Sequence, residues 1–363
     1  MEGPELQPKV ASGPMPLPRR RMQDDTRHHV AIIGTGQMGL VMADAMASRG
    51  VKISMWGPRP ETVERLASNR ALPDRLPGVE LGPSVIVSPD PEEVVGSATI
   101  VLNAIPTQFI RSTLGTVLEH ARPGVPIVST AKGIENGTLM RPSEVLGELA
   151  EARLGCPSPC AVLSGPTIAT ELARRLPAVL VSASDDDELA VAVQDLLDVP
   201  WIRTYTLDDP LGVELAGATK NVIALAAGMV DGLGIGDNAK SALLARGLAE
   251  IARLGSALGA RLETFFGIAG VGDLATTCFS PHGRNRTCGE AIGRGESLEE
   301  IQARSTDVVE GVATTRSVLD LAAREGVDMP ITTAVGSILF EGTSPADAIE
   351  DLMDRALRPE ALQ

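Results

Sequence analysis

A glycine-rich turn near residue 34 constrains this chain more than any other feature of its sequence. The run GTGQMG at residues 34–39 directly follows the apolar residues 30–33 and opens a helix-compatible segment. Between a strand and a helix, Gly34 permits a tight turn, Gly36 lets the backbone approach a pyrophosphate, and Gly39 lets the helix pack closely on the sheet. The N-terminus of that helix also attracts an anion. The pattern predicts a dinucleotide-binding turn, although such glycines can also serve only to form the turn.

From residue 29 to about residue 206, short β-branched runs alternate with segments of helix length. This alternation is typical of a parallel sheet covered by helices. The predicted strands lie at residues 30–33, 51–55, 85–87, 99–102, 126–128, 161–163, 178–181 and 202–205. The sequence thus predicts an α/β fold whose N-terminal part is a Rossmann-type, mostly parallel sheet.

After about Asp208 the sequence becomes helical in character. Residues 211–230 and 239–258 are rich in Ala, Leu and Gly and carry apolar residues at three- and four-residue spacing. Residues 267–289 hold too much Gly, Thr and Asn for a continuous helix, so we expect a loop that faces the cleft. The second part of the chain is therefore predicted to be a C-terminal all-α domain.

These patterns divide the chain into three regions. They are a flexible N-terminal arm at residues 1–28, a dinucleotide-binding Rossmann domain at residues 29–206 and a helical substrate domain at residues 207–363. The arm holds five prolines and the basic run Arg19 to Arg21. No apolar segment follows these arginines, so an export signal is not expected.

Composition excludes several classes of partner. Apolar residues make up 44% of the chain, enough for a sizeable core, while the 2% of aromatics and the net charge of -15 argue against nucleic-acid binding. We find no apolar run that approaches the roughly 18 residues needed to span a bilayer. The four cysteines have neither zinc-site spacing nor the density of a disulfide framework. We therefore expect reduced thiols, no metal, and a cytoplasmic protein without a membrane span.

The end of the second predicted strand bears on the choice of cofactor. An NAD-specific site often has an acid about twenty residues beyond the turn, and none stands there in this chain. Arg59 could instead meet a 2'-phosphate, or it could be a solvated surface arginine. The sequence therefore predicts binding of NADP(H) or NAD(H), with NADPH accepted at least as well as NADH.

Two lysines are the best candidates for acid–base chemistry. Reduction of a carbonyl by a nicotinamide needs a proton donor near the oxygen, and none of the four histidines has a context that suits this role. Lys220 stands in an otherwise small and apolar helix, where burial would lower its pKa, although a lysine there can also extend to solvent. Lys132 follows the strand at residues 126–128, at the sheet edge where ligands of open α/β folds bind.

A further group of residues offers the contacts that a small phosphate ester requires. Residues 164–167 (SGPT) follow a predicted strand, and residues 272–277 (GDLATT) precede residues 283–286 (GRNR). Together these segments supply a carboxylate, hydroxyls, backbone donors and a guanidinium. We therefore expect a small phosphorylated substrate.

Taken together, these motifs carry a family resemblance. From about residue 29 to residue 345 the chain resembles NAD(P)-dependent glycerol-3-phosphate dehydrogenases. Besides the glycine-rich turn, the matching motifs are AKG at 131–133, SGPT at 164–167, GVEL at 212–215, KNVIA at 220–224, RGLAE at 246–250, GDL at 272–274, GRNR at 283–286 and VVEG at 308–311. The resemblance implies an enzyme that interconverts sn-glycerol 3-phosphate and dihydroxyacetone phosphate and supplies glycerol 3-phosphate for phospholipid synthesis.

Site roles also follow from the resemblance. Lys220 would accept the proton during oxidation and donate it in the reverse direction, with Lys132 and Asp273 as further catalytic residues. The implied substrate contacts are Lys132, Gly165, Thr167, Lys220, Asn221, Asp273, Thr277, Gly283, Arg284 and Asn285. Together with Gly34, Gly36, Gly39 and Arg59, the implied cofactor contacts are Gln37, Met38, Lys132, Ala169, Arg284, Val308 and Glu310.

Two alternative functions stay open at this point. A ketopantoate reductase-like enzyme or a β-hydroxyacid dehydrogenase would act on a carboxylate, whereas Arg284 and Asn285 beside Gly283 favour a phosphate. A catalytically silent dinucleotide-binding module would not need Lys220, Asp273 and Arg284 together. The sequence leaves the oligomeric state open, and a homodimer is compatible with it.

Overall fold

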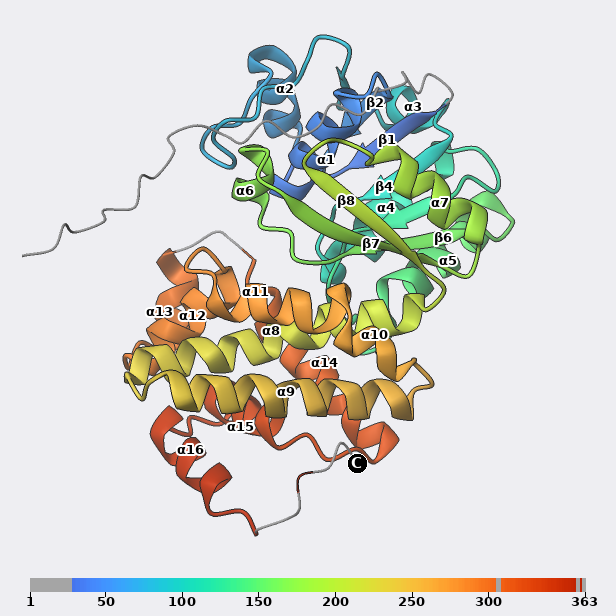
Figure 1. Ribbon diagram of the computed structural model, residues 1–363. Coiled ribbons are helices and arrows are strands. Elements are labelled where there is room, and N and C mark those ends of the chain that lie inside the picture. Colours follow the sequence, from blue (N-terminus) through green and yellow to red (C-terminus); the bar gives the residue numbers. More distant parts are fainter. Residues whose placement is uncertain (1–27, 305–307, 357–359, 361–363) are drawn as a thin grey trace, which may run out of the picture.

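The computed structural model describes residues 28–304, 308–356 and 360, so the predicted arm lies outside the described residues except for His28. Eight strands form one sheet in the order β3-β2-β1-β4-β5-β6-β7-β8 (Figure 1). The strands are β1 (His29–Ile33), β2 (Lys52–Trp56), β3 (Ile86–Val87), β4 (Ile100–Asn103), β5 (Ile127–Ser129), β6 (Cys160–Ser164), β7 (Ala178–Ser184) and β8 (Ile202–Leu207). All eight predicted strands are confirmed.

Strand pairing is parallel throughout except between β6 and β7. The chain runs outward from β1 to β3 and then returns to place β4 on the other side of β1. Ligands of open α/β sheets bind at such a reversal, beyond the carboxyl ends of the strands. The predicted Rossmann-type, mostly parallel sheet is therefore confirmed. We call the carboxyl ends of its strands, near β1 and β4, the ligand-binding edge.

Both faces of the sheet are covered by helices. Val30 and Ile32 of β1 share a buried core with residues of α1, α2 and α7, whereas Ala31 and Ile33 share another with residues of α3, α4 and α5. The helices of this half are α1 (Gln37–Ala47), α2 (Pro60–Asn69), α3 (Pro91–Val95), η1 (Thr107–Phe109), α4 (Ile110–Val117), η2 (Leu118–His120), α5 (Pro142–Leu154), α6 (Ala169–Ala173) and α7 (Asp187–Leu196). Alternate residues of one strand thus feed two apolar layers, as expected for a doubly covered sheet.

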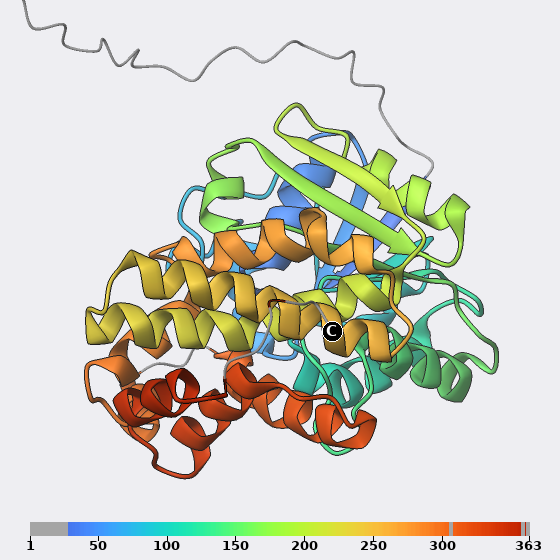
Figure 2. The ribbon, with the colours of Figure 1, turned by 60° about the horizontal axis from the view of Figure 1, so that its bottom comes forward.

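The second half of the chain is helical, as predicted, and packs below the sheet in the view of Figure 1. Its helices are α8 (Pro210–Leu233), α9 (Asp237–Ala257), α10 (Leu262–Phe266), the π-helix η3 (Ile268–Gly272), α11 (Asp273–Phe279), α12 (Arg284–Gly293), α13 (Leu298–Arg304), α14 (Glu310–Glu325), α15 (Pro330–Phe340) and α16 (Pro345–Met353). Figure 2 shows α9 and α8 running side by side through this half. Whether residues 29–206 and 207–363 are independent domains stays a prediction.

One secondary-structure prediction is wrong. Residues 267–289 do not form a loop: they contain η3, α11 and the first part of α12. Their glycines allow close packing rather than breaking the helices. A Cβ on Gly270 would lie 2.1 Å from the carbonyl oxygen of Phe265, and one on Gly289 would lie 2.0 Å from that of Leu225 in α8. The contact at Gly270 is local, with the end of α10, whereas the contact at Gly289 is a tertiary contact with α8 that stabilises a segment of low helix propensity.

The central helix α8 also corrects the expectation about apolar length. It is 24 residues long, with a mean hydropathy of 1.3 in its most apolar window, and could cross a membrane by length and composition alone. That window is entirely buried in the protein. Helix α8 is therefore the core helix around which the second half is packed.

Glycines bring α8 and α12 into backbone contact. A Cβ on Gly228 of α8 would lie 2.0 Å from the carbonyl oxygen of Arg286, and a Cβ on Gly232 would lie 2.3 Å from that of Glu290. Neither helix could approach so closely with a larger residue at these positions. The glycines thus fix the N-terminus of α12 relative to Lys220, which lies on the same helix α8.

A buried ion pair joins α8 to the sheet half. Glu214 of α8 is 2% exposed and accepts hydrogen bonds from Arg141 Nη1 at 2.7 Å, Ser143 N at 2.7 Å and Ser143 Oγ at 2.6 Å. Arg141 and Ser143 stand at the start of α5. Since removal of one partner would leave a buried charge unpaired, this junction resists separation of the two halves.

Candidate active site

The glycine-rich turn has the geometry that its sequence predicts. Gly34 has a φ of +127°, and a Cβ there would lie 2.7 Å from the carbonyl oxygen of Ala104. A Cβ on Gly39 would lie 2.1 Å from the carbonyl oxygen of Gly34, so α1 packs directly on the turn. A Cβ on Gly36 would meet nothing within 4 Å. No side chain caps the N-terminus of α1, and the free space at Gly36 suits the approach of a pyrophosphate to this helix end.

The residues beside the turn take different positions. Gln37 is exposed and its Nε2 donates to the carbonyl oxygen of Arg75 at 2.7 Å, whereas Met38 packs against the core. Arg59 is exposed and precedes α2, just beyond the end of β2. Gln37 and Arg59 are therefore exposed after β1 and β2, where the sequence predicts a dinucleotide, whereas Met38 packs on the core.

The two predicted lysines meet at one carboxylate. Asp273, at the start of α11, accepts from Lys220 Nζ through Oδ1 and from Lys132 Nζ at 2.6 Å through Oδ2. Lys220 Nζ also donates to Thr277 Oγ1 at 2.7 Å, and Lys132 Nζ donates to the carbonyl oxygen of Gly165 at 3.0 Å. Lys132 follows β5, so the cluster joins the carboxyl edge of the sheet to α8 and α11.

Burial sets the protonation equilibria of this cluster. Lys220 is 5% exposed, and loss of hydration lowers its pKa to about 8, with Asp273 opposing and Lys132 reinforcing the change. Burial alone would raise the pKa of Asp273, but Lys132 and Lys220 outweigh it and keep that pKa below its ordinary value. Lys220 can therefore exchange a proton near neutral pH while Asp273 stays ionised.

An amide relay holds Lys132 in position. Asn221 Nδ2 donates to the carbonyl oxygen of Lys132 at 3.0 Å, and Asn285 Nδ2 donates to Asn221 Oδ1 at 2.9 Å. Asn285 Oδ1 in turn accepts from the backbone N–H of Gly311 at 2.9 Å. The relay connects the sheet edge with α8, α12 and the start of α14. Asn221 and Asn285 are both buried, and these hydrogen bonds join parts of the protein to one another.

Arg284 lies at the exposed N-terminus of α12, directly after Gly283. Its Nη1 donates to the carbonyl oxygen of Val308 at 3.0 Å. The nearby Glu310 begins α14; burial raises its pKa, while the positive charges of Arg284, Lys132 and Lys220 act in the opposite direction. The positive charges of Arg284, Lys132 and Lys220 thus all favour the ionised form of Glu310.

The remaining predicted residues follow β6. Gly165 has a φ of +129°, and a Cβ there would lie 2.8 Å from the carbonyl oxygen of Val179. Thr167 is partly exposed and its Oγ1 donates to the carbonyl oxygen of Gly165 at 3.1 Å. Ala169 begins α6 and packs against the sheet core. The positive φ of Gly165 is a conformation that favours glycine. In this conformation its carbonyl oxygen accepts the hydrogen bond from Lys132 Nζ.

Sequence reasoning missed two residues that follow β4 at the same edge of the sheet. Thr107, 2% exposed at the start of η1, has an Oγ1 without a hydrogen-bond partner among the described residues, and its backbone N–H faces the carboxylate of Glu310. Phe109, in the same short helix, is 49% exposed. Both follow β4 at the ligand-binding edge, so their only sequence signal was their place after a strand.

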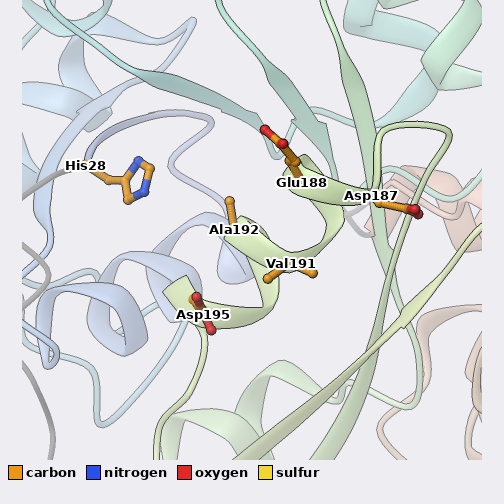
Figure 3. A pocket seen from close by; sticks show the side chains of 6 residues that line it. All are labelled: His28, Asp187, Glu188, Val191, Ala192 and Asp195. Atoms are coloured by element: carbon orange, nitrogen blue, oxygen red, sulfur yellow. The ribbon is translucent and has the colours of Figure 1, made fainter.

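A hollow of about 390 Å³ elsewhere is not part of this site. It is lined by His28 and by residues of α7, of which Asp187, Glu188 and Asp195 are acidic (Figure 3). It contains none of the residues predicted from sequence. Carboxylates of this kind would repel a phosphorylated ligand. Within the parts of the chain that the structure describes, no group of three or more His, Cys, Asp or Glu side chains could hold a metal ion.

Comparison with known families now decides the family. Residues 29–190 match the model described as NAD-dependent glycerol-3-phosphate dehydrogenase N-terminus, and residues 209–350 match the corresponding C-terminus. The chain belongs to the NAD-dependent glycerol-3-phosphate dehydrogenase family. The resemblance inferred from the motifs is thereby confirmed over both halves.

Individual relatives of this family agree. A glycerol-3-phosphate dehydrogenase (NAD(P)+) of Thermobifida fusca is 45% identical over 332 residues, which cover 91% of this chain and 98% of the relative. The crystal structure of a glycerol-3-phosphate dehydrogenase from Coxiella burnetii has a TM-score of 0.85 and 33% identity, and the match covers 90% of this chain and 99% of that one. A ketopantoate reductase from Ralstonia eutropha, at 15% identity and a TM-score of 0.55, shares the fold alone.

Proposed function

We propose that this protein interconverts sn-glycerol 3-phosphate and dihydroxyacetone phosphate with NAD(P)+ or NAD(P)H, and so supplies glycerol 3-phosphate for phospholipid synthesis. The observation that carries this proposal is the cluster of buried Lys220 and Asp273 with partly exposed Lys132 at the ligand-binding edge of a dinucleotide sheet. Family membership supports the same reaction. A silent binding module would not need a buried lysine and a second, partly exposed lysine paired with one carboxylate.

The proposed chemistry assigns one proton transfer to the protein. During oxidation, neutral Lys220 accepts the hydroxyl proton from C2 of glycerol 3-phosphate as the carbonyl forms; during reduction, the Lys220 ammonium returns it to the carbonyl oxygen. Lys132 orients that oxygen, and Asp273 stabilises the ammonium form of Lys220. The nicotinamide, when bound, accepts or supplies the hydride at C2.

Binding is assigned to residues around the cluster. We propose that Arg284 and the backbone N–H groups at the start of α12 hold the phosphate, with Gly283, Asn285 and Thr277 beside it. Gly165, Thr167 and Asn221 complete the substrate side. The open space at Gly36 and the uncapped start of α1 fit a dinucleotide pyrophosphate, and Gln37, Met38, Arg59, Ala169, Val308 and Glu310 are its proposed neighbours.

A steady-state assay tests the proposal directly. The purified protein is given dihydroxyacetone phosphate with NADH or NADPH, and ketopantoate with NADPH in parallel. We expect turnover of dihydroxyacetone phosphate and little of ketopantoate, because the cations around the site suit a phosphate. Preference for ketopantoate would overturn the assignment, and binding of a dinucleotide without turnover of either substrate would favour the silent module.

We also propose a cytoplasmic location and a homodimer. The cysteines of the described chain are all free thiols, and Cys278 and Cys288 are buried, which suits a reducing compartment. Light scattering on the purified protein tests the oligomeric state, and a mass equal to one chain would reject the dimer.

A further inference from the structure

An ion network outside the lysine cluster joins three helices of the second half. Asp231, near the end of α8, accepts hydrogen bonds from Lys240 Nζ of α9 at 2.9 Å through Oδ1 and at 2.7 Å through Oδ2. Arg286 Nη2 of α12 lies 2.6 Å from the same Oδ2. We call these three residues the Asp231 network. The proposed proton transfer uses none of them, yet Lys240 is only 6% exposed, so loss of Asp231 would leave a buried charge unpaired.

Arg286 connects the network to the proposed phosphate site. It lies two residues after Arg284, in the first turn of α12, whose backbone N–H groups are proposed phosphate donors. Its Nη1 also donates to Glu290 Oε2 at 3.2 Å, about one turn further along α12. A Cβ on Gly228 of α8 would lie 2.0 Å from the carbonyl oxygen of Arg286. The backbone and the side chain of Arg286 are therefore both held against α8.

Lys240 connects the network to the end of α11. Its Nζ lies 5.0 Å from the centre of the Phe279 ring, a distance at which an ammonium and an aromatic face attract each other. Phe279 is the last residue of α11, two positions after Thr277, which accepts a hydrogen bond from Lys220 Nζ. The ring is 52% exposed, so it gains less from burial than a core phenylalanine does, and the contact with Lys240 matters more for its position.

The Asp231 network thus restrains both ends of the connection between α11 and α12. This connection is formed by residues 280–283 alone, and the backbone N–H of Gly283 donates to the carbonyl oxygen of Ser280 at 3.2 Å. Arg284, the proposed phosphate ligand, follows it directly. Since a guanidinium and backbone N–H groups must converge on one phosphate, the relative position of α11 and α12 determines how well they can bind it.

We propose that the three residues of the Asp231 network are positioning residues for the substrate phosphate, which hold the end of α11 and the start of α12 so that Arg284 can bind it. The proposal rests on the proposed function and adds residues that support its phosphate site. The three residues act through Arg284 and do not touch the substrate. Their contribution is preorganisation, because donors that are already held in place lose less conformational entropy when the phosphate binds.

Steady-state kinetics with dihydroxyacetone phosphate at saturating NADPH test the proposal. We expect Lys240→Met to raise the KM about tenfold and to change kcat less than about threefold, because the phosphate contact is weakened throughout the reaction. Lys240→Arg, which keeps the positive charge, should restore most of the affinity. The matched control Lys52→Met removes an exposed ammonium at the start of β2, at the sheet edge opposite the ligand-binding edge, and should leave both constants unchanged.

A double-substitution cycle distinguishes positioning from direct contact. In the Arg284→Ala background, Lys240→Met should raise the KM less than about threefold, because a residue that acts through Arg284 then has little left to position. A second variant, Phe279→Leu, removes only an exposed ring and keeps the ion network, so it should fold even where Lys240→Met does not. We expect it to raise the same KM about threefold, since it loses only the contact with the ammonium.

Four results would count against the proposal or its premise, and they can be told apart. An unchanged KM in both Lys240→Met and Phe279→Leu would exclude the network from phosphate binding. A rise of about tenfold that persists in the Arg284→Ala background would show that Lys240 binds the substrate itself. Equal weakening of NADPH and dihydroxyacetone phosphate, with a lower melting temperature, would show a purely structural role. If the unaltered protein did not turn over dihydroxyacetone phosphate, the proposed function itself would fail.

Discussion

The dinucleotide turn and the lysine cluster are two halves of one proposed site, yet they are built in opposite ways. The turn is made of backbone, and its six residues are contiguous at positions 34–39. The cluster is made of side chains from the loop after β5, from α8 and from α11, and its members Lys132, Lys220 and Asp273 are 141 residues apart at the extremes. Local sequence therefore specifies the turn, whereas only packing of the helical half against the sheet creates the cluster. The two should respond differently to substitution.

Removal of the Lys220 amine should have the largest effect. Lys220→Ala is expected to lower kcat for both directions by about a thousandfold or more, because the variant lacks the amine proposed to exchange the proton, whose pKa is about 8. Dissociation constants for the dinucleotides, measured by fluorescence titration, should stay nearly unchanged because the turn is separate. Turnover at the level of the unaltered protein would remove Lys220 from its acid–base role.

Substitution of two glycines of the turn should affect different properties, namely stability at Gly39 and dinucleotide binding at Gly36. Gly39→Ala should destabilise the protein by about 3 kcal/mol, because its Cβ would collide with the carbonyl oxygen of Gly34. Gly36→Ala, where the Cβ meets no protein atom, should leave the melting temperature unchanged but weaken dinucleotide binding. Thermal denaturation and dinucleotide titration of both variants measure the contrast. Equal loss of stability in the two would contradict the account of the turn.

Substitution of Arg284 tests the proposed contact with the substrate phosphate. Arg284→Ala should raise the KM for dihydroxyacetone phosphate by roughly ten- to a hundredfold and change kcat much less, because a phosphate contact supplies binding energy throughout the reaction. Steady-state kinetics at saturating NADPH give both constants. An unaltered KM would show that the phosphate is held elsewhere.

The pH dependence of kcat/KM tests the role of Lys220 in the cluster. Since Lys220 must be neutral to accept a proton, kcat/KM for oxidation should rise with pH and level off above its pKa of about 8. Lys132→Met removes a neighbouring positive charge that lowers this pKa, so the profile should move to higher pH. A profile that stays in place would mean that another group controls the rate.

The smallest effect is expected at His29, on the strand that leads into the turn. Burial lowers its pKa from 6.5, and its ring contacts Ser54 Oγ at 2.8 Å and Ser97 Oγ at 3.1 Å. The unfolded chain therefore takes up a proton below about pH 6.5 that the folded chain resists, and stability should fall as the pH drops through that region. Melting temperatures between pH 7.5 and 5.5 should show a weaker dependence for His29→Asn. Identical slopes would exclude this histidine as the cause.

Several features of the fold could be read from the sequence because they depend on neighbouring residues. Alternation of β-branched runs with helix-length segments located all eight strands. The same local reasoning failed at residues 267–289, where the close contact of Gly289 in α12 with Leu225 in α8 outweighed intrinsic propensity. Local reasoning also could not predict that Arg75 donates to the carbonyl oxygen of Thr35, because no pattern around residue 75 indicates a contact with residues 34–39.

The sequence by itself determined the turn, the order of the strands along the chain and the residue types available for catalysis, since each is encoded within a few adjacent positions. Tertiary structure alone decided that Asp273 binds both lysines, that Lys220 is buried deeply enough to lower its pKa, and that Arg75 reaches Thr35. These properties depend on distances and hydration that arise only when remote segments pack together, because Coulombic and desolvation energies depend on positions in space rather than in sequence.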